Sequence, residues 1–509
     1  MWTSLTSSFA AAALVVVALA LHRIIHTRFV SPLRHIPGPF LASITDKWLL
    51  WYDLAGLRTL TIDALHRQYG PAVRVAPHEV SFADASVVHQ LYGPHTAFMK
   101  APVYESMSIP PLGIFSLRDK AAHSQRRGLL SHAFAQQNIA DCTPTLARKV
   151  DLLLALFRRE GVGEATDVLL RFRLFALDCV GELFLGKSFG ALESGLAPRF
   201  LHDMDQHFLL GGVGWNFPWV MTLLRLLPIP AIRLWLGSSE RIAQYGNTAF
   251  RDYVQRYGRD SKRRDLLTKI LVPEGQEAVL TDRETYVEVG NLVFAGTDTT
   301  STTLTYMFWC LARYPAWQGR IREEMGALLR GRARGPYDQK SMMVHMPVVD
   351  AVINESLRMY PAAPASLPRV TPLGGWRWRE YDIPAQTIVS MQCYTTHRNA
   401  TAFPDPDAFL PERWLAGEQT PDAKALFMPY SKGTRACLGK GLAQLQLKLV
   451  VLALVSRYEV GVPPQTTEAS MAMRDHFLVL PQAGKCDLIF RRTADGDVGL
   501  TSVRGVRRQ

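Results

Sequence analysis

One cysteine in the sequence lies in a setting suited to metal chemistry. Cys437 lies near the end of the segment Pro429–Gly439, and an apolar stretch with helical periodicity follows it directly. A helix N-terminus carries partial positive charge, and the nearby cations Lys432, Arg435 and Lys440 add to it. These charges favour thiolate over thiol, and the thiolate is the form that binds a metal. The segment therefore predicts a metal-binding thiolate.

Other residues of this segment suit a flat anionic ligand. Gly433 permits a tight turn, and Gly439 lets a flat ligand approach the backbone. Arg435 can pair with an anionic group. The alternative for a lone cysteine beside a helix is a small core residue, which is its commoner role.

A second group of polar residues interrupts a long apolar helical pattern. Residues 295–300 read Ala-Gly-Thr-Asp-Thr-Thr, and threonine and aspartate are poor helix formers. Gly296 is expected to make room for a ligand against the helix, while Asp298 and Thr299 provide an acid and a hydroxyl that can pass protons. Poor helix formers at consecutive positions inside a helical pattern contradict the local helix propensity, and such conflicts are expected at functional sites. The alternative is a polar kink whose threonine hydroxyls bond back to the helix.

The cysteine segment resembles the haem-binding signature of the cytochrome P450 family, Phe-x-x-Gly-x-Arg-x-Cys-x-Gly, with Tyr430 in place of the usual Phe. The resemblance, which extends over nearly the whole chain, implies that Cys437 is the axial thiolate of haem b and that Arg435 pairs with a haem propionate. It also places residues 295–300 in the distal groove above the iron, where dioxygen needs two protons to split. The extra hydroxyl of Tyr430 is expected to shift the potential of the iron.

The resemblance also gives a role to three charged residues. Glu355 and Arg358 lie three positions apart on a predicted helix, hence on one face. Taken alone, such a pair is usually a solvated surface ion pair. In the family, an arginine placed like Arg413 joins this pair in a buried triad that supports the haem side of the core. We therefore interpret the three as structural, because removing one would strand a buried charge.

Three more residues resemble propionate-binding positions. His123 and Arg127 fall where the family often has Trp-x-x-x-Arg, with histidine replacing tryptophan. Arg369 follows an apolar segment, as a propionate-binding arginine of the family does. Surface solvation is the alternative for each.

The activity implied by the resemblance is a monooxygenase that inserts one oxygen atom of O2 into a lipophilic small molecule and reduces the other to water. Electrons are expected from NADPH through a separate NADPH-cytochrome P450 reductase, because no nucleotide-binding glycine-rich fingerprint and no flavin domain follows the haem region. The sequence between Leu367 and Cys486 is most similar in style to fungal enzymes of secondary metabolism. A polyketide, terpenoid or alkaloid intermediate is therefore the expected substrate.

Two surfaces follow from this interpretation. The expected walls of the substrate pocket are mostly apolar, namely residues 104–115, 293–294, 363–367 and 476–477. The expected docking patch for the reductase's acidic face is basic, namely Arg126, Lys432, Lys440 and Lys448. A solvated face is the alternative for the patch.

Two other functions stay open. A haem-thiolate isomerase or dehydratase rearranges a peroxide without a reductase, but such enzymes often lack the acid and alcohol present here as Asp298 and Thr299. The second is a non-catalytic membrane haem-binding protein.

The composition limits the class of protein in which these residues are positioned. Of the 509 residues, 48% are hydrophobic and 20% are charged, which excludes a disordered or fibrous chain. The charge of +12 is scattered, so nucleic acid is not an expected partner. The six cysteines are too widely spaced for a disulfide framework or a paired zinc site, which favours a reducing compartment.

Periodicity predicts a mainly α fold with small β-sheets (α+β), and the resemblance implies the P450 fold in a single large haem domain behind a transmembrane helix. The predicted helices include residues 141–158, 282–314, 316–329, 348–360 and 439–458. The predicted strands are residues 73–75, 387–391 and 486–490.

The N-terminus is expected to be a membrane anchor. Residues 1–21 contain no charged side chain, and a helix over residues 5–21 would span about 26 Å, close to a hydrocarbon core. A cleaved signal peptide is the alternative, but the positive charge at Arg23 follows the apolar run. The positive-inside rule then leaves the catalytic domain in the cytosol, on a single-pass anchor in the endoplasmic reticulum membrane.

These features divide the chain into an anchor (1–26), a proline-rich connector (27–45), a catalytic domain (46–500) and a basic tail (501–509).

A second apolar stretch, Leu209–Gly237, contains prolines that exclude one spanning helix. It is expected either to dip into the bilayer surface as a hairpin or to form buried helices with Trp215, Trp219 and Trp235 in the core.

Overall fold

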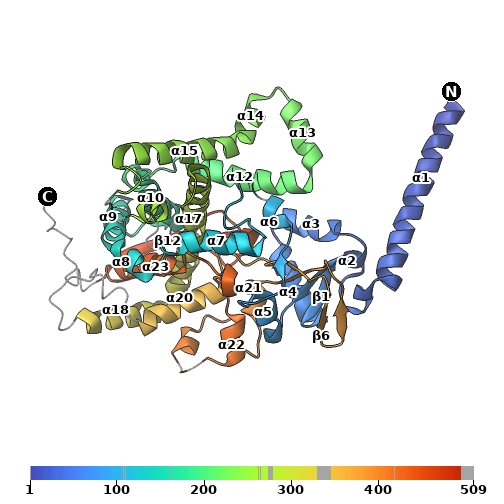
Figure 1. Ribbon diagram of the computed structural model, residues 1–509. Helices are drawn as coiled ribbons and strands as arrows, with labels where there is room; N and C mark the ends of the chain where they lie inside the picture. The colour runs from blue at the N-terminus through green and yellow to red at the C-terminus, as the bar shows by residue number, and fades with distance from the viewer. Residues whose placement is uncertain are drawn as a thin grey trace. The chain divides into compact units, whose positions relative to one another are not determined.

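The computed structural model describes most of the chain, and the polypeptide divides into two compact units (Figure 1). The described residues are 2–106, 108, 110–160, 162–261, 263, 265–272, 279–329, 346–415, 417 and 419–493. The first unit comprises Met1–Ala101, Pro364–Pro404 and Pro421–Met428, and the second comprises Pro102–Ala363, Asp405–Thr420 and Pro429–Gln509. The predicted basic tail and the side chain of Trp215 lie outside the described residues.

The first unit is built on a five-stranded sheet in the order β1-β2-β8-β5-β3. The strands are β1 (Ala72–Ala76), β2 (Glu79–Phe82), β8 (Ile388–Met391), β5 (Arg369–Val370) and β3 (Met99–Lys100). Only the β2–β8 pair is parallel. The predicted strands at residues 73–75 and 387–391 thus belong to one sheet, although about three hundred residues separate them in the chain. Val73 and Val75 pack against Leu49 and Ile62 of the helices beside the sheet.

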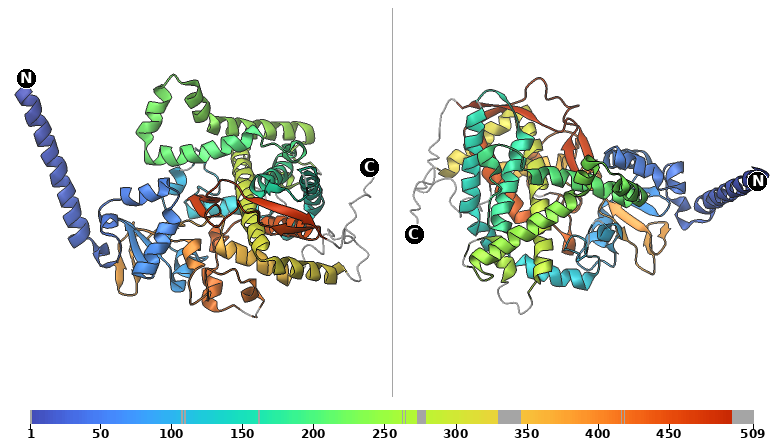
Figure 2. Two further views of the ribbon diagram at one scale, coloured as in Figure 1. Left: turned by 180° about the vertical axis from the view of Figure 1, so that it is seen from behind. Right: turned by 90° about the horizontal axis from the view of Figure 1, so that it is seen from above.

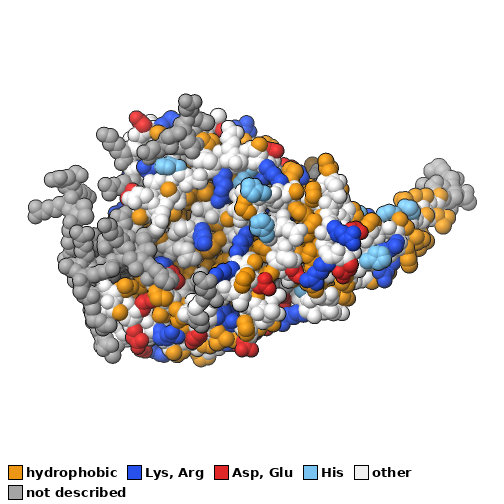
Figure 3. All heavy atoms as spheres, turned by 60° about the horizontal axis from the view of Figure 1, so that its bottom comes forward, with side chains coloured by type: hydrophobic (Ala, Val, Ile, Leu, Met, Phe, Trp, Pro, Cys, Tyr) orange, Lys and Arg blue, Asp and Glu red, His pale blue; other side chains and the backbone are white. Residues whose placement is uncertain are grey.

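The chain enters this unit through α1 (Trp2–Ile25), whose described apolar side chains are largely exposed (Figure 3). Among the described residues, no helix combines the length and the apolar character needed to cross a membrane. The predicted anchor is therefore not confirmed. The connector contains three helical segments, His26–Val30, Pro32–His35 and α2 (Phe40–Ile44), and Pro37–Pro39 lies between the last two.

The second unit is a helical body. Its principal helices are α9 (Thr143–Glu160), α10 (Val168–Leu185), α17 (Asp282–Arg313), α18 (Pro315–Leu329), α20 (Pro347–Met359) and α23 (Lys440–Val455). The 32-residue α17 begins with a capping box between Thr281 and Glu284, and α10 packs along it with fully buried phenylalanines on both helices. The mainly helical fold with small sheets is confirmed.

Two small sheets complete this unit. One contains β4 (Ala165–Asp167), β12 (Asp487–Arg492) and β9 (Tyr458–Gly461), so the predicted strand at residues 486–490 is present. The other pairs β10 (Met473–His476) with β11 (Leu478–Pro481).

The second apolar stretch is broken at its prolines, as predicted. Helices α12 (Arg199–Asn216), α13 (Pro218–Leu226) and α14 (Pro230–Leu236) follow one another, and α13 and α14 project beyond the ends of α12 and α15 (Ser238–Tyr257) in both views of Figure 2. Trp219 is 66% exposed and Leu226 is 74% exposed. The buried arrangement with Trp219 in the core is therefore wrong, since short helices joined by prolines leave one side without a partner.

Candidate active site

Cys437 lies between a short 3-10 helix, Gly433–Arg435, and the first residue of α23. Its N–H donates to the carbonyl oxygen of Tyr430 at 2.8 Å, which closes the loop. Gly433 has φ +63°, a left-handed conformation that favours glycine, so the expected tight turn is present. Ser431 has φ +59° as well, a strained position that the sequence did not reveal.

Cys437 is the only exposed cysteine of the six, all of which the structure describes. Enclosure by protein raises the pKa of its thiol, while the N–H groups of Gly439 and Lys440 and the charge of Arg127 oppose that rise. These donors and this cation act in the direction expected from the sequence, and the thiolate at Cys437 stays a prediction.

Two arginines join the cysteine loop to α7 (Lys120–Ser131) and the residues before it. Arg435 donates to the carbonyl oxygens of Leu117 at 2.6 Å and Arg118 at 2.9 Å. In return, Arg127 donates to the carbonyl oxygen of Ala436 at 2.8 Å. The structure thus brings together two of the residues predicted to bind propionates, and both also tie the loop in place.

The other two predicted propionate ligands lie in different units. His123 is buried on α7, one helical turn before Arg127 and on the same face. Arg369 is buried in β5 of the first unit, where it donates to the carbonyl oxygen of Pro368 at 3.0 Å and lies over the Tyr92 ring. The propionate roles stay predictions.

The hydroxyl of Thr299 donates to the carbonyl oxygen of Ala295 at 2.6 Å, one turn earlier in α17. Thr297 bonds to Val293 in the same way, at 2.7 Å. This is the back-bonded arrangement named above as the alternative. Ala295 is nevertheless exposed and Thr299 is partly exposed, so this face of the helix is open to a ligand.

Asp298 is held in a charged network that the sequence did not reveal. Arg173 on α10 donates from Nε to Oδ1 of Asp298 at 2.9 Å and from Nη2 to Asp205 on α12 at 2.6 Å. Burial raises the pKa of Asp298, and the charge of Arg173 opposes that rise. The available signal was Arg173 in the largely apolar pattern of residues 168–185, although Arg171, Asp178 and Glu182 also interrupt that pattern.

Gly296 does not make room for a ligand, so that expectation is wrong. A Cβ at this position would lie 2.7 Å from Cγ1 of Val180 on α10. The glycine instead allows α10 and α17 to pack closely, because it points to the side of the helix that faces α10.

Glu355, Arg358 and Arg413 form one buried cluster. Arg358 donates to both oxygens of Glu355, at 2.8 and 2.9 Å, and Arg413 donates from Nε at 3.2 Å. The Trp414 indole also donates to Glu355 at 2.9 Å, a contact that sequence analysis did not anticipate. The cluster joins α20 to the segment Pro411–Trp414 and leaves no carboxylate oxygen unpaired.

Several predicted pocket residues meet in the second unit. The ring of Phe115 lies 5.4 Å from that of Tyr104 and 5.8 Å from that of Phe477, both edge to face. Phe115 and Phe477 are exposed, so this aromatic cluster offers an apolar surface. Of the other expected wall residues, 364–367 belong to the first unit, whereas 293–294, 363 and 476 belong to the second.

The expected reductase patch is wrong in two of its members. Arg126 is buried on α7 and ion-paired with Glu284 and Glu288 of α17. Lys448 is only 12% exposed and pairs with Asp350 at 2.7 Å. Helix packing has turned both cations inward, and only Lys440 and the partly exposed Lys432 are accessible.

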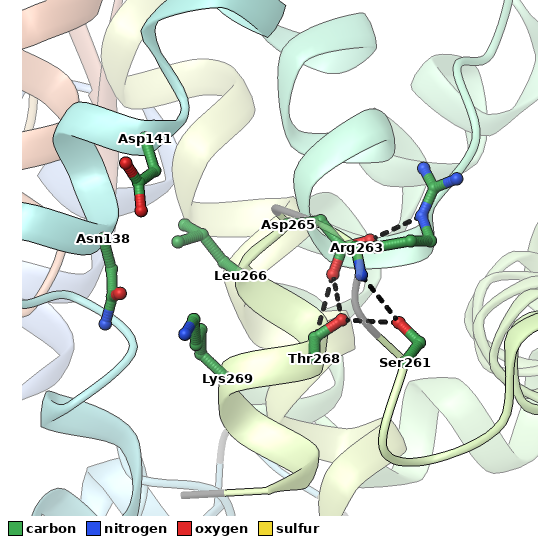
Figure 4. Close-up of a pocket in the computed structure, with 8 residues that line it drawn as sticks. All are labelled: Asn138, Asp141, Ser261, Arg263, Asp265, Leu266, Thr268 and Lys269. Atoms are coloured by element: carbon green, nitrogen blue, oxygen red, sulfur yellow. Dashed lines mark hydrogen bonds and ion pairs between the residues drawn. The ribbon is translucent and has the colours of Figure 1, made fainter. Parts of the chain in front are cut away.

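A separate hollow of about 220 Å³ lies beside α8 (Gln136–Asp141) and α16 (Leu266–Leu271) (Figure 4). Asp265 accepts hydrogen bonds there from Arg263 and Thr268. The hollow shares no residue with the groups described above, and its polar network caps α16.

Comparison with known proteins places these residues in a family. The cytochrome P450 family model matches residues 47–488. The chain is 30% identical to the cytochrome P450 monooxygenase tazI of Aspergillus terreus, over 94% of this chain and 98% of that protein. It is 31% identical to the cytochrome P450 monooxygenase stcB of Emericella nidulans, over 91% of this chain and 89% of that protein. The crystal structure of the cytochrome P450DA heme domain superposes with a TM-score of 0.75 at 19% identity, covering 90% of this chain and 98% of that one.

Proposed function

The chain belongs to the cytochrome P450 family of monooxygenases, and we propose that Cys437 binds the iron of a haem b in this protein. The observation that carries the proposal is that Cys437, alone among the six cysteines, is exposed. The backbone beside it suits a flat ligand, because a Cβ at Gly439 would meet nothing within 4 Å. Arg127 and Arg435 tie the loop to α7 and the residues before it, and in this proposal they supply cations for the propionates.

Haem b, when bound, supplies the iron chemistry by which dioxygen is activated for insertion of one oxygen atom into a substrate. The chain's own residues hold the cysteine loop in place and deliver protons. Thr299 presents a hydroxyl on the open face of α17, and Asp298 holds an acid beside it, shielded by Arg173. Glu355, Arg358 and Arg413 keep α20 and the segment before the cysteine loop in register.

We propose that a separate NADPH-cytochrome P450 reductase supplies the electrons. Its acidic face would meet Lys440 and Lys432, the two members of the predicted patch that are accessible. The substrate is a lipophilic small molecule, supported by the exposed aromatic rings of Phe115 and Phe477. The relatives come from Aspergillus and Emericella, which supports an intermediate of fungal secondary metabolism.

We also propose that the protein acts at the endoplasmic reticulum membrane, attached by α1, with its catalytic domain in the cytosol. Leu14 of α1 is 70% exposed and Trp51, in the same unit, is 71% exposed. In the second unit, the exposed residues of α13 and α14 offer a further apolar surface. Fractionation of cells that express the full chain or residues 27–509 tests the anchor: we expect the full chain with membranes, and equal recovery of both in the soluble fraction would contradict it.

The haem proposal is tested by the spectrum of the reduced protein under carbon monoxide. A thiolate-bound haem gives a red-shifted Soret band, and we expect Cys437→Ala to lose it. Cys142→Ala, a change at a buried cysteine, is the matched control and should keep it. An unchanged band in Cys437→Ala would overturn the assignment. A product that requires NADPH and reductase then separates a monooxygenase from an isomerase or dehydratase.

A further inference from the structure

One buried carboxylate joins three parts of the second unit. Glu288 of α17 is fully buried, and its Oε1 accepts hydrogen bonds from the N–H of Ile114 at 2.8 Å and from Nη1 of Arg126 at 2.7 Å. Arg126 lies on α7 and also pairs with Glu284, which is one turn earlier on α17. Glu288 thus connects α17 both to α7 and to the segment that precedes α7.

The backbone at Gly113 lies directly over this carboxylate. A Cβ at Gly113 would lie 2.1 Å from Nδ2 of Asn291 and 3.2 Å from Oε2 of Glu288, so glycine allows the segment to pack closely on α17. Burial raises the pKa of Glu288, and hydrogen bonds from Arg126, Ile114 and Asn291 oppose that rise. Because the protein encloses Glu288, it can influence a substrate only through the residues that it holds.

The residue next to this contact is Phe115, an exposed member of the aromatic cluster described above. The N–H groups of Ser116 and Leu117 both donate to the carbonyl oxygen of Gly113, at 2.9 and 3.0 Å, so residues 113–117 form a tight turn. The hydrogen bond from Ile114 to Glu288 fixes this turn on α17. It therefore also fixes the place of the exposed ring.

The same turn is tied at its other end to the cysteine loop. The carbonyl oxygen of Leu117 accepts a hydrogen bond at 2.6 Å from Arg435, which lies two residues before Cys437. Arg127 on α7 donates to the carbonyl oxygen of Ala436 at 2.8 Å. The exposed ring therefore lies in a short span that is fixed both to α17 and to the loop that carries the proposed iron ligand.

We infer that Glu288 is a positioning residue that holds the Phe115 ring in place for the apolar part of the substrate. The inference rests on the proposed function and deepens it, because it names a determinant of the preference for lipophilic molecules. A ring that is already ordered loses little conformational entropy when a substrate packs against it. Loss of Glu288 would release one of the two fixed points of the span. The affinity for an apolar chain should then fall, while the cysteine loop keeps its contacts with Arg127 and Arg435.

The test compares two iron ligands that differ in their apolar part. Imidazole and 1-dodecylimidazole both bind haem iron through a ring nitrogen and shift the Soret band, but only the second carries a chain that can pack against Phe115. Both are titrated into the haem-loaded full chain, and the ratio of their affinities is the chain preference. Phe115→Ala should lower the affinity for 1-dodecylimidazole about tenfold, because apolar contact is lost, and change that for imidazole less than about twofold. Glu288→Leu should have the same effect.

Two further variants separate positioning from a merely structural role. Glu288→Gln keeps an oxygen that can accept from Ile114, so it should keep most of the chain preference. Glu288→Leu combined with Arg126→Leu removes both buried charges and so leaves neither uncompensated, but it still lacks the acceptor. It should therefore lose the chain preference about tenfold, as Glu288→Leu does. When Glu288→Leu is added to Phe115→Ala, it should cause little further loss, because both changes act through the same ring.

Glu284→Gln is the matched control, because Glu284 also pairs with Arg126 but does not hold Ile114. It should keep the chain preference. Haem content and melting temperature identify a variant that fails to fold, and the doubly substituted variant then takes the place of Glu288→Leu. If the doubly substituted variant keeps the chain preference, Glu288 only balances the charge of Arg126 and the inference is wrong. Equal weakening of both ligands, equal loss in Glu284→Gln, or full additivity with Phe115→Ala would overturn it as well. Absence of the haem-thiolate band would instead contradict the proposed function.

Discussion

Arg173 on α10 and Asp298 on α17 form a buried ion pair, with Nε of the guanidinium 2.9 Å from Oδ1 of the carboxylate. The same guanidinium binds Asp205 of α12, whose side chain is 49% exposed. The acid expected to pass protons is thus held by an arginine that also reaches a more accessible carboxylate. This arrangement makes the charge state of Asp298 depend on Arg173.

Removal of Arg173 is expected to cause a pH-dependent loss of stability. Burial already raises the pKa of Asp298 in the folded protein, so protonation of Asp298 favours folding as the pH falls through that raised pKa. Arg173→Met should raise the pKa further and lower the free energy of unfolding by about 3–5 kcal/mol at pH ~8, with a smaller loss at pH ~5. Thermal unfolding at the two pH values measures both.

Arg171→Met is the control for that measurement, since Arg171 lies on the same helix and pairs with Glu160 at 2.8 Å. Its loss should be smaller, because the side chain of Glu160 is 21% exposed against 10% for Asp298, so water can solvate the carboxylate that is left unpaired. A loss in Arg173→Met that is the same at both pH values would show that Asp298 does not titrate between them.

Replacement of Thr299 is expected to uncouple electron consumption from product formation. Thr299→Ala keeps Cys437 and so should keep reduction and oxygen uptake, but it lacks the hydroxyl that orders proton delivery. A positioned proton-transfer group contributes on the order of 10² to 10⁴ in rate, so product should fall while NADPH consumption and release of hydrogen peroxide persist. All three quantities are measured in one assay with a known substrate.

Thr299→Ser should restore most of the product, and Thr303→Ala is the matched control. Thr303 bonds back to the carbonyl oxygen of Thr299 at 2.8 Å, so it makes the same kind of contact one turn later. If Thr299→Ala keeps product matched to NADPH, or if Thr303→Ala uncouples equally, the hydroxyls only shape the helix. Asp298→Asn should instead slow the whole cycle, because the acid itself is lost.

The hydroxyl of Tyr430 is expected to contribute both to stability and to the potential of the iron. It accepts a hydrogen bond from Nε2 of Gln444 on α23 at 3.1 Å, and the charge of Cys437 adds to burial in raising its pKa. Tyr430→Phe should lower the free energy of unfolding by about 1 kcal/mol, because it leaves the Gln444 amide unpaired. Tyr430→Phe combined with Gln444→Leu should recover most of that loss.

The potential of the iron in the same two variants is measured by spectroelectrochemical titration. A shift shared by the single and the double variant would assign the effect to the hydroxyl itself. No shift in either variant would contradict the expectation that Tyr430 tunes the iron.

Electron transfer from the reductase is expected to depend on Lys440 and on salt. Charge steering is screened at high ionic strength, so the rate should fall as salt rises from about 0.01 M to 1 M. Lys440→Glu should lower the low-salt rate severalfold and weaken its salt dependence. Lys47→Glu is the control, because it changes the net charge equally at an exposed position of the first unit. A rate indifferent to salt and to Lys440→Glu would reject the docking patch.

The cysteine loop and the helical body were predictable because they depend on residues close together in the chain. The position of Cys437 just before α23 follows from the apolar periodicity after it and from the turn at Gly433. Pro218 and Pro230 likewise begin α13 and α14, because proline cannot continue a preceding helix but fits the first position of a new one. Such features are set by local backbone geometry, which the sequence states directly.

The partners of the charged and small residues on α17 were decided only by tertiary structure. Asp298 meets Arg173 across 125 positions, Gly296 meets Val180, and Arg126 turns inward to Glu288 across 162 positions. Periodicity shows that a residue lies on a given face of a helix, but not which helix will pack there. The need of a buried charge for a partner arises from desolvation, and the need for glycine arises from close contact with a neighbouring helix. Both depend on which helices pack together and not on the local conformation of the chain.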